Sequence, residues 1–484
     1  MDDNKITDYN LSDEIVKALT GLGYETLTEV QQQVIPLALT GHDIIVRSQT
    51  GSGKTAAFAI PICEKVEIEK RNPQVLVLTP TRELAVQLKQ DIANIGRFKR
   101  IRCSALYGRQ PIEIQRRELQ QRVHMIVGTP GRVSDHIERE NMDLSEIQYL
   151  IIDEADKMLE MGFLEQVEAI ITMLPGKRVT MLFSATMPDK IIEICNQYMI
   201  DPVKIDIESA APTKLQIEQR YYEVEEHEKV ELLEKMICIE RPESCILFCN
   251  TREQVDFLFE TLERNEHLCG RLHGGMEQRD RLDTIQRFKR GEFPFLVATD
   301  VLARGIHIDQ ISLVINYDMP FEKENYIHRI GRTGRAGNTG IAISFVSKNE
   351  RRSLQEIEEY TQCTILKQEF PTKEEVAAGK LIFESSQNRK AIVKIDKSEV
   401  LNQEITRIRI NSGKKNKMRP GDILGAISSI PTMTGDDIGI IDVQDTCSYV
   451  EILGGKGDYV IEQLQETKIK GKVQSIKKVA FRSI

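Results

Sequence analysis

Three acidic side chains, Asp153, Glu154 and Asp156, lie within four residues of the segment LIIDEADKM at 150–158. They directly follow an apolar run that is typical of a buried parallel strand. Carboxylates this close repel one another, and the end of a strand does not need them for folding. The pattern therefore predicts a site that holds positive charge.

A second segment, SQTGSGKT, has the spacing of a phosphate-binding loop between a predicted strand and a predicted helix. Its glycines let backbone N–H groups close around phosphates at a helix N-terminus, where the helix dipole favours anions. Ser48 stands where the motif G-x-x-x-x-G-K-T has its first glycine. The residues expected to line the nucleotide are Ser48, Gln49, Thr50, Gly51, Ser52, Gly53, Lys54 and Thr55.

The two segments together predict hydrolysis of a nucleotide held with Mg²⁺. Lys54 is expected to reach the outer phosphates, and Thr55 and Asp153 to bind the metal, Asp153 through water. Glu154, the next residue, is placed to orient or deprotonate the attacking water. Asp156 is one step too far from the metal and is expected to hold a neighbouring loop.

Short β-branched runs alternate with longer amphipathic stretches over the first 365 residues and would position these side chains. The predicted strands are DIIVRS, VLVLTP, HMIVGTP, YLIIDEAD and VTMLFSAT, followed after a linker at 208–214 by SCILFCNT, FLVATD, LVINYD and IAISFVS. This is the βαβ pattern of parallel sheets covered by helices, whose ligands gather at the carboxyl ends of the strands. An α/β fold with two such domains is therefore expected.

The remainder of the chain differs in pattern and in charge. From residue 404 it reads strand, helix, two strands, helix, strand, which is the split βαβ arrangement. This segment has thirteen lysine or arginine residues and ten acidic ones, although the whole chain has a net charge of -9. Six of the basic residues lie between Arg407 and Arg419 with no acid among them. Such a cluster predicts an anionic partner.

Composition excludes several classes of protein. The chain has 484 residues, 40% of them hydrophobic and 29% charged, which is typical of two to four globular domains. No apolar stretch approaches the roughly 20 residues that span a bilayer, and the polar start does not resemble a signal peptide. Nine cysteines without paired spacing favour small buried thiols over zinc or disulfides, and hence a cytoplasmic location. The sequence does not indicate an oligomeric state.

Seven motifs occur in the order found in DEAD-box RNA helicases. They are the phosphate loop, PTRELA (80–85), TPGR (129–132), DEAD (153–156), SAT (184–186), VATDVLARGI (297–306) and HRIGRTGR (328–335). Residues from about 6 to 365 resemble that family. The resemblance implies two tandem RecA-like parallel-sheet domains, with ATP and Mg²⁺ as cofactors and RNA as the partner.

The resemblance also assigns roles around the nucleotide. GYETLTEVQ at 23–31 is similar to the family's adenine-recognition element, with Gln31 pairing adenine and Tyr24 covering a ring face. Leu27 and Ile6 depart from it, standing where the family has proline and an upstream aromatic. The residues implied in the second domain are Arg332 and Arg335 as arginine fingers on the γ-phosphate, His328 as a bridge between loops, and Gly305 and His307 at the nucleotide. His307 replaces the family's aspartate.

RNA is expected across both domains. The resemblance implies backbone contacts from Arg82, Gly108, Thr129, Arg132, Arg281 and Thr299. Hydroxyls, backbone N–H groups and guanidinium groups suit phosphates and sugars and carry no base code, whereas contact with 2′-hydroxyls favours RNA. Ser184 and Thr186, together with Asp156 and His328, are expected to couple the nucleotide and RNA sites.

The C-terminal segment resembles the RNA-recognition-motif domain of the DbpA subgroup. Tyr449 is the one aromatic platform where two are usual, so the residues expected to bind RNA with it are Arg407, Arg409, Lys414, Lys415, Lys417 and Arg419. The resemblance implies anchoring on large-subunit ribosomal RNA in pre-ribosomal particles. The predicted domains are residues 1–210, 211–368 and 404–484, with a connector at 369–403.

Three other functions are compatible with these residues. The chain could be a general RNA remodeller or chaperone with another target, a translocating DNA helicase, or an RNA-binding scaffold with weak ATPase activity. The C-terminal domain could also be a protein-binding module with a solvated basic face. Stimulation of ATP hydrolysis by RNA or by DNA separates the helicase alternatives.

Overall fold

The computed structural model describes residues 5–48, 51–207, 217–300, 311–334, 339–379 and 404–479. Interresidue contacts divide the chain into two units, one of residues 1–207 with 395–484 and the other of residues 208–394. The predicted linker at 208–214 and most of the predicted connector lie outside the described residues. The domain boundaries expected from the sequence stay a prediction.

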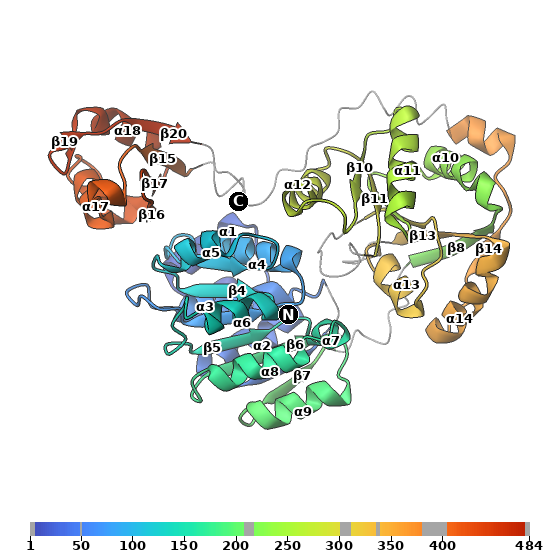
Figure 1. Ribbon diagram of the computed structural model, residues 1–484, viewed down its shortest axis with the longest axis horizontal. Helices are drawn as coiled ribbons and strands as arrows, with labels where there is room; N and C mark the ends of the chain where they lie inside the picture. Colours follow the sequence, from blue (N-terminus) through green and yellow to red (C-terminus); the bar gives the residue numbers. More distant parts are fainter. Residues whose placement is uncertain are drawn as a thin grey trace. The chain divides into compact units, whose positions relative to one another are not determined.

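The first sheet is parallel and has the described strands in the order β3-β4-β2-β5-β6-β1-β7 (Figure 1). The strands are β1 (Ile44–Arg47), β2 (Val75–Leu78), β3 (Cys103–Leu106), β4 (Met125–Gly128), β5 (Tyr149–Ile152), β6 (Val179–Ser184) and β7 (Val203–Asp206). Alternate residues of β2 point to opposite faces, so Val75 and Val77 belong to one core and Leu76 and Leu78 to the other. Both faces are therefore buried.

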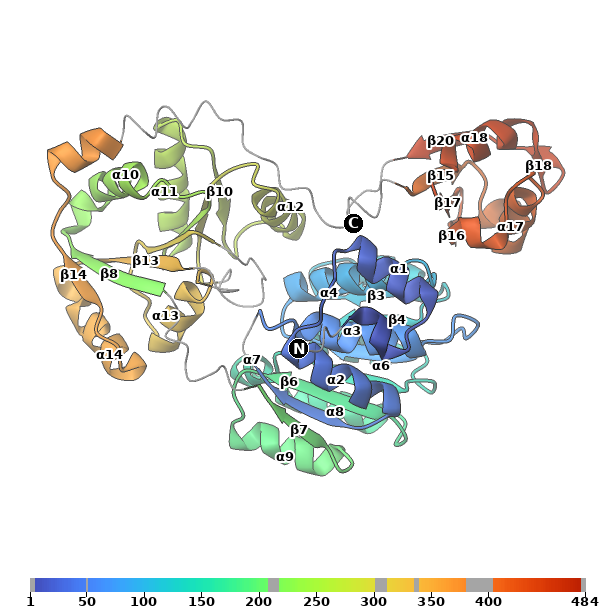
Figure 2. The ribbon, with the colours of Figure 1, turned by 180° about the vertical axis from the view of Figure 1, so that it is seen from behind.

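Helices cover both faces of this sheet, as the two opposite views show (Figure 1 and Figure 2). The first core takes side chains from α1 (Asp13–Gly21), α2 (Glu29–Thr40), α3 (Lys54–Lys65) and α4 (Arg82–Ile95). The second core takes them from α6 (Pro130–Glu138), α7 (Ala155–Glu160), α8 (Leu164–Met173) and α9 (Asp189–Tyr198), with α5 (Ile112–Leu119) at its margin.

The second sheet repeats this architecture with the order β10-β11-β9-β12-β13-β8-β14, again parallel. Its strands are β8 (Ile217–Glu223), β9 (Cys245–Phe248), β10 (Cys269–Leu272), β11 (Phe295–Ala298), β12 (Leu313–Asn316), β13 (Gly340–Val346) and β14 (Leu366–Gln368). Its helices are α10 (Lys229–Glu240), α11 (Arg252–Arg264), α12 (Gln278–Lys289), α13 (Lys323–Ile330) and α14 (Arg351–Thr361).

The C-terminal residues form a small antiparallel sheet in the order β16-β17-β15-β20. Its elements are β15 (Thr406–Ile410), α17 (Pro420–Ser428), β16 (Ile438–Val443), β17 (Ser448–Ile452), α18 (Gly457–Glu466) and β20 (Ile476–Val479). A hairpin of β18 (Lys468–Ile469) and β19 (Lys472–Val473), which the sequence did not predict, precedes β20. A separate core lies between this sheet and its two helices.

The predicted fold class is confirmed: two parallel-sheet α/β domains precede a small split βαβ domain. All nine cysteines are free thiols; five are buried, three are partly exposed and Cys363 is exposed. Throughout the described ranges, the helices are too short or too polar to cross a membrane.

Candidate functional site

The phosphate loop joins β1 to α3, as the sequence predicts. Gly53 precedes α3 in a left-handed conformation with φ 95°, and a side chain there would lie 2.5 Å from Gln31 Nε2. Only glycine therefore fits without a shift of its neighbours. Lys54 is the first residue of α3, and its buried Nζ donates to Ser48 O at 2.9 Å. Gln49 and Thr50 lie outside the described residues.

The upstream element contacts this loop directly. Gln31 is buried; its Oε1 accepts from Thr28 N at 2.9 Å and its Nε2 donates to Gly53 O at 3.1 Å. Thr28 Oγ1 donates to Ser52 O at 2.9 Å. Each end of the Gln31 amide retains one further hydrogen-bonding position, which is what pairing with adenine requires. The adenine role of Gln31 stays a prediction, but its connection to the phosphate loop is visible.

The two departures from the family's adenine element are accommodated in the core. Ile6 and Leu27 are each 5% exposed and belong to the first hydrophobic core. Tyr24 is half-buried against the same core, and burial, followed by the charge of Asp91, raises its pKa to about 12. Tyr24 is therefore a neutral phenol at physiological pH, and its contact with a nucleotide stays a prediction.

The acidic turn lies at the carboxyl end of β5, in the middle of the sheet. Asp153 is buried, and this burial raises its pKa to about 6 although nearby Lys54 acts in the opposite direction. Burial likewise lowers the pKa of Lys54. Glu154 has φ 54° and ψ 50°, a left-handed conformation that is uncommon outside glycine. Both carboxylates are thus held in a site that ordinary folding does not favour.

The residues present fit Mg²⁺. The acids Asp153, Glu154 and Asp156 outnumber the buried lysines Lys54 and Lys157, so a bound cation would balance the charge of the cluster. Glu154 Oε2 is buried and has no hydrogen-bond partner within the described part of the chain. Carboxylate and hydroxyl oxygens are the ligand types that Mg²⁺ prefers. Asp153 and Thr55 have ligand atoms of the right type, and their role as metal ligands stays a prediction.

Asp156 connects the acidic turn to the loop after β6. Its Oδ2 accepts from Ala185 N at 3.1 Å, Thr186 N at 2.9 Å and Thr186 Oγ1 at 3.1 Å. In return, Asp156 N donates to Ser184 Oγ at 3.2 Å, and Ser184 Oγ donates to Thr186 O at 2.6 Å. Adjacent strands β5 and β6 make this contact possible. The prediction that Asp156 holds a neighbouring loop matches these bonds.

Replacing Asp156 by alanine should loosen this loop. Charged acceptors contribute about 1.5–3 kcal/mol per hydrogen bond, so the amides of Ala185 and Thr186 should exchange at least about tenfold faster. Hydrogen-exchange mass spectrometry of peptides covering 184–186 measures this. Glu193→Ala removes the same charge from an exposed position and should leave exchange unchanged. Equal exchange in both variants would contradict the assignment.

The predicted RNA residues of the first domain lie at the same sheet edge but beside other strands. Arg82 begins α4 after β2, Gly108 follows β3, and Thr129 caps α6 after β4. Strands β3, β4 and β2 are neighbours, whereas β5, β6 and β1 carry the nucleotide residues. The carboxyl ends of the strands in this one sheet thus carry the predicted RNA residues on one side and the predicted nucleotide residues on the other. A Cβ at Gly108 would lie 3.4 Å from the Arg82 guanidinium, which places these two residues together.

Arg132 is used mainly inside the protein. Its Nη1 donates to Gln110 O and to Gln115 Oε1, both at 2.9 Å. Gln115 is fully buried, and its Oε1 also lies 3.0 Å from His136 Nε2. The guanidinium therefore supports the loop that carries Gly108. A direct RNA contact by Arg132 stays a prediction, and its visible role is to shape that loop.

The structure describes some of the predicted site residues of the second domain and not others. Thr299 follows β11, and Arg281 lies on α12; both are buried. His328 is on α13 and accepts through its carbonyl oxygen from Arg332 Nε at 3.3 Å. Gly305, His307 and Arg335 lie outside the described residues, so their roles stay predictions.

Sequence reasoning missed Arg329, which is fully buried on α13. Its guanidinium binds both carboxylate oxygens of Asp300, at 2.5 Å and 3.0 Å, and donates to Asp318 O at 2.7 Å and Asn250 Oδ1 at 2.9 Å. These partners follow the adjacent strands β11, β12 and β9. Arg329 thus fixes α13 to three strand ends, and Arg332 follows two residues after the end of this helix. The position of Arg329 within the motif HRIGRTGR is the sequence feature that could have identified it.

The basic residues of the C-terminal domain form two groups. Arg407 and Arg409 lie on β15, and the Arg407 guanidinium covers the Tyr449 ring at 4.6 Å. The other group is exposed at the start of α17, and the new hairpin adds to it because Lys470 pairs with Asp422 at 3.5 Å. We call this second group the basic surface; it consists of Lys414, Lys415, Lys417, Arg419 and Lys470.

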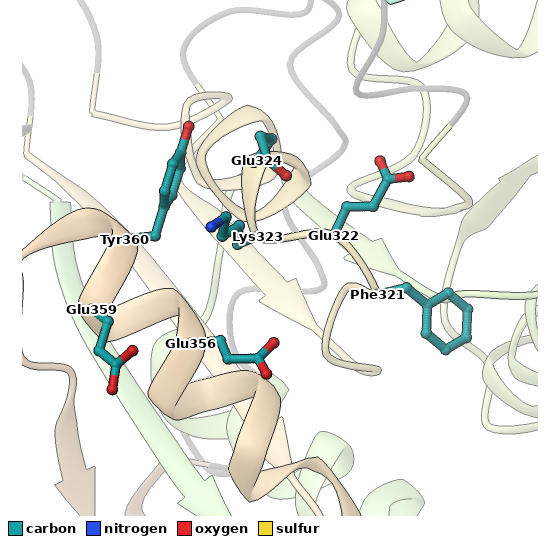
Figure 3. A pocket seen from close by; sticks show the side chains of 7 residues that line it. All are labelled: Phe321, Glu322, Lys323, Glu324, Glu356, Glu359 and Tyr360. Carbon is teal, nitrogen blue, oxygen red and sulfur yellow. The ribbon is translucent and has the colours of Figure 1, made fainter.

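A pocket of about 540 Å³ lies between α13 and α14, and none of the predicted site residues lines it (Figure 3). Its lining comprises Phe321, Glu322, Lys323, Glu324, Glu356, Glu359 and Tyr360. Four carboxylates against one ammonium do not suit ATP or RNA phosphates. The candidate nucleotide and RNA sites are therefore identified by the chemistry of their side chains and not by the volume of a cavity.

Comparison with known proteins agrees with this geometry. Residues 28–194 match the DEAD/DEAH box helicase family, residues 228–337 the helicase conserved C-terminal domain, and residues 407–478 the DbpA RNA binding domain. The chain is 52% identical over 470 residues to the ATP-dependent RNA helicase DbpA of Bacillus subtilis, which covers 97% of this chain and 98% of the relative. It is 44% identical to the DEAD-box ATP-dependent RNA helicase CshA of Geobacillus kaustophilus, over 76% and 79% of the two chains.

A solved structure shares the fold of the two α/β domains. S. cerevisiae Dbp5 bound to RNA and ADP BeF3 superimposes with a TM-score of 0.68 at 30% identity, covering 79% of this chain and 99% of that one. The B. subtilis relative extends the likeness through the C-terminal domain. The chain therefore belongs to the DbpA subgroup of DEAD-box ATP-dependent RNA helicases.

Proposed function

We propose that this RNA helicase opens short RNA duplexes while its C-terminal domain is anchored on large-subunit ribosomal RNA in assembling ribosomal particles. The observation that carries the catalytic part is the phosphate loop beside the acidic turn, with Lys54 and Asp153 buried in one charge cluster. The observation that supports the anchoring part is the exposed basic surface on a domain of the DbpA type.

Residues of the first domain would perform the ATP chemistry. Lys54 binds the outer phosphates, and Thr55 and Asp153 would hold Mg²⁺, which supplies positive charge against the triphosphate. Glu154 orients the attacking water and accepts its proton. The predicted arginine fingers, Arg332 and Arg335, belong to the other unit of the chain. Hydrolysis therefore requires both units at one nucleotide.

Strand separation follows from the same requirement. The residues predicted to bind RNA, like those predicted to bind ATP, are divided between the two units. Binding of either ligand would therefore favour the joined arrangement and raise the affinity for the other. A strand bent across the joined units no longer fits a regular duplex, and a few base pairs open. The bonds of Asp156 with the loop of Ser184 and Thr186 support this coupling, because they link the nucleotide strand β5 to its neighbour β6.

The basic surface is proposed to supply the anchor. Its lysines are exposed, so they are available to phosphates, which give affinity without base specificity. Tyr449 already has one ring face covered by Arg407, which limits base stacking on the sheet. Specificity for one RNA would then come from the shape that the basic surface and its neighbouring loops recognise.

Capture of cellular RNA tests the anchor. The full chain is crosslinked to total RNA in cells or lysate, and the retained RNA is sequenced. Enrichment of large-subunit ribosomal RNA is expected. Enrichment of messenger or transfer RNA instead would replace the assembly role by that of a general RNA remodeller.

A charge reversal of the basic surface should weaken the anchor. Changing Lys414, Lys415 and Lys417 to glutamate removes up to three phosphate contacts, so the slope of log K against log salt should become less negative by about 2–3. Fluorescence anisotropy with a ribosomal RNA fragment measures this. The matched control reverses the exposed lysines Lys65, Lys177 and Lys190 of the first domain. The same slope in both triple variants would contradict the assignment.

A further inference from the structure

Lys157 makes a buried ion pair with the proposed catalytic acid. It lies on α7, three residues after Glu154, and its Nζ donates to Glu154 Oε1 at 2.7 Å. The exposed fractions of the two side chains are 11% for Lys157 and 4% for Glu154. Exposed pairs at this spacing contribute little, but a buried carboxylate depends strongly on the partner that remains to it.

The two oxygens of Glu154 differ in their surroundings. Oε1 accepts from the Lys157 ammonium, whereas Oε2 is buried without a hydrogen-bond partner among the described residues. The left-handed backbone of Glu154 sets the direction of the side chain, and Lys157 sets its rotation. One oxygen is thus fixed and the other is available to a water molecule, which is the arrangement that a general base needs.

Within the described residues, Lys157 is the side chain that donates a hydrogen bond to the Glu154 carboxylate. The Lys54 ammonium donates to Ser48 O, and Asp156 is bonded to the loop after β6. Among the described residues, Asp153 Oδ1 accepts from the backbone N–H of Glu154 at 3.0 Å and has no bond with the Glu154 carboxylate. Lys157 is therefore the cation that orients the Glu154 side chain in this part of the chain.

We propose that Lys157 is a positioning residue for ATP hydrolysis, holding one carboxylate oxygen of Glu154 so that the other meets the attacking water. This inference rests on the proposed role of Glu154. In the step concerned, the water oxygen bonds to the γ-phosphorus while Glu154 Oε2 accepts the water proton. The bond from that phosphorus to the β–γ bridging oxygen breaks, and its electron pair leaves with ADP.

Replacing Lys157 by methionine removes the ammonium and keeps the length of the side chain. In the full chain, kcat for RNA-stimulated ATP hydrolysis should fall about tenfold or more, because general-base catalysis loses its geometry. The KM for ATP and the Kd for a fluorescent ADP analogue should change by less than about twofold, because Lys157 lies on α7 and not in the phosphate loop. Lys157→Arg, which retains a charged donor, should recover part of kcat.

A double-variant cycle separates positioning from folding. In the Glu154→Gln background, adding Lys157→Met should not slow single-turnover hydrolysis further. An equal loss in both backgrounds, or a raised KM with a lowered Tm, would show a structural role and overturn the proposal. Lys177→Met, at an exposed lysine of the same domain, is the control.

The outcomes also separate this inference from the proposed function. Normal turnover in Glu154→Gln would remove the role of Glu154 itself. Greatly reduced turnover in Glu154→Gln beside normal turnover in Lys157→Met would overturn only the inference about Lys157.

Discussion

A Glu154→Gln variant is expected to hydrolyse ATP in the presence of RNA about 10²–10⁴-fold more slowly than the unchanged chain. Glutamine has the same shape but does not accept a proton from water, and it gives up the ion pair with Lys157. Nucleotide binding should persist, because Lys54 and the phosphate loop are unchanged. RNA-stimulated phosphate release and binding of a fluorescent ADP analogue measure the two properties.

The matched control for this variant is Glu165→Gln, at an exposed position on α8 of the same domain. It should hydrolyse ATP at the rate of the unchanged chain. Equal and negligible rates for the unchanged chain and Glu154→Gln would instead favour an RNA-binding scaffold. A Glu154→Gln rate close to that of the unchanged chain would mean that another group activates the water.

An Arg329→Met variant is expected to destabilise the region around α13 by about 3–5 kcal/mol, because it leaves Asp300 without its buried cation. Several backbone and side-chain oxygens at the ends of β9, β11 and β12 lose their donors at the same time. Lysine should not restore stability, since it lacks the bidentate fork that binds Asp300. RNA-stimulated ATP hydrolysis should fall as well, because Arg332 lies two residues after α13 and donates to the carbonyl oxygen of His328 on that helix.

Hydrogen-exchange mass spectrometry resolves this effect within the full chain. Peptides covering β12 and α13 should lose protection in Arg329→Met, while peptides of the first sheet keep theirs. Arg352→Met is the control, because the ion pair of Arg352 with Glu356 is exposed and contributes at most about 1 kcal/mol. Unchanged protection of α13 in Arg329→Met would mean that packing alone holds this helix.

Local sequence was enough to find the motifs and every inner strand of the two parallel sheets except β8, which lies between β13 and β14 and was not predicted. Strands β2, β5 and β9 are apolar on both faces because helices cover both sides of each sheet, and this gives a continuous signal. The edge strands β3, β7, β10 and β14 gave no such signal. Edge strands carry charged or polar residues, such as Lys204 in β7 and Lys367 in β14, because one side is unpaired.

The sequence by itself determined the fold class, the phosphate loop and the acidic turn, because their residues are adjacent in the chain and their spacing sets the chemistry. Only the tertiary structure decided which side chains meet: Asp156 with Thr186, Arg132 with the loop of Gly108, and Arg329 with three strand ends. These contacts depend on strand order, since β5 lies beside β6, and β9 beside β11 and β12. Strand order results from packing across the whole sheet, so no local pattern of residues specifies it.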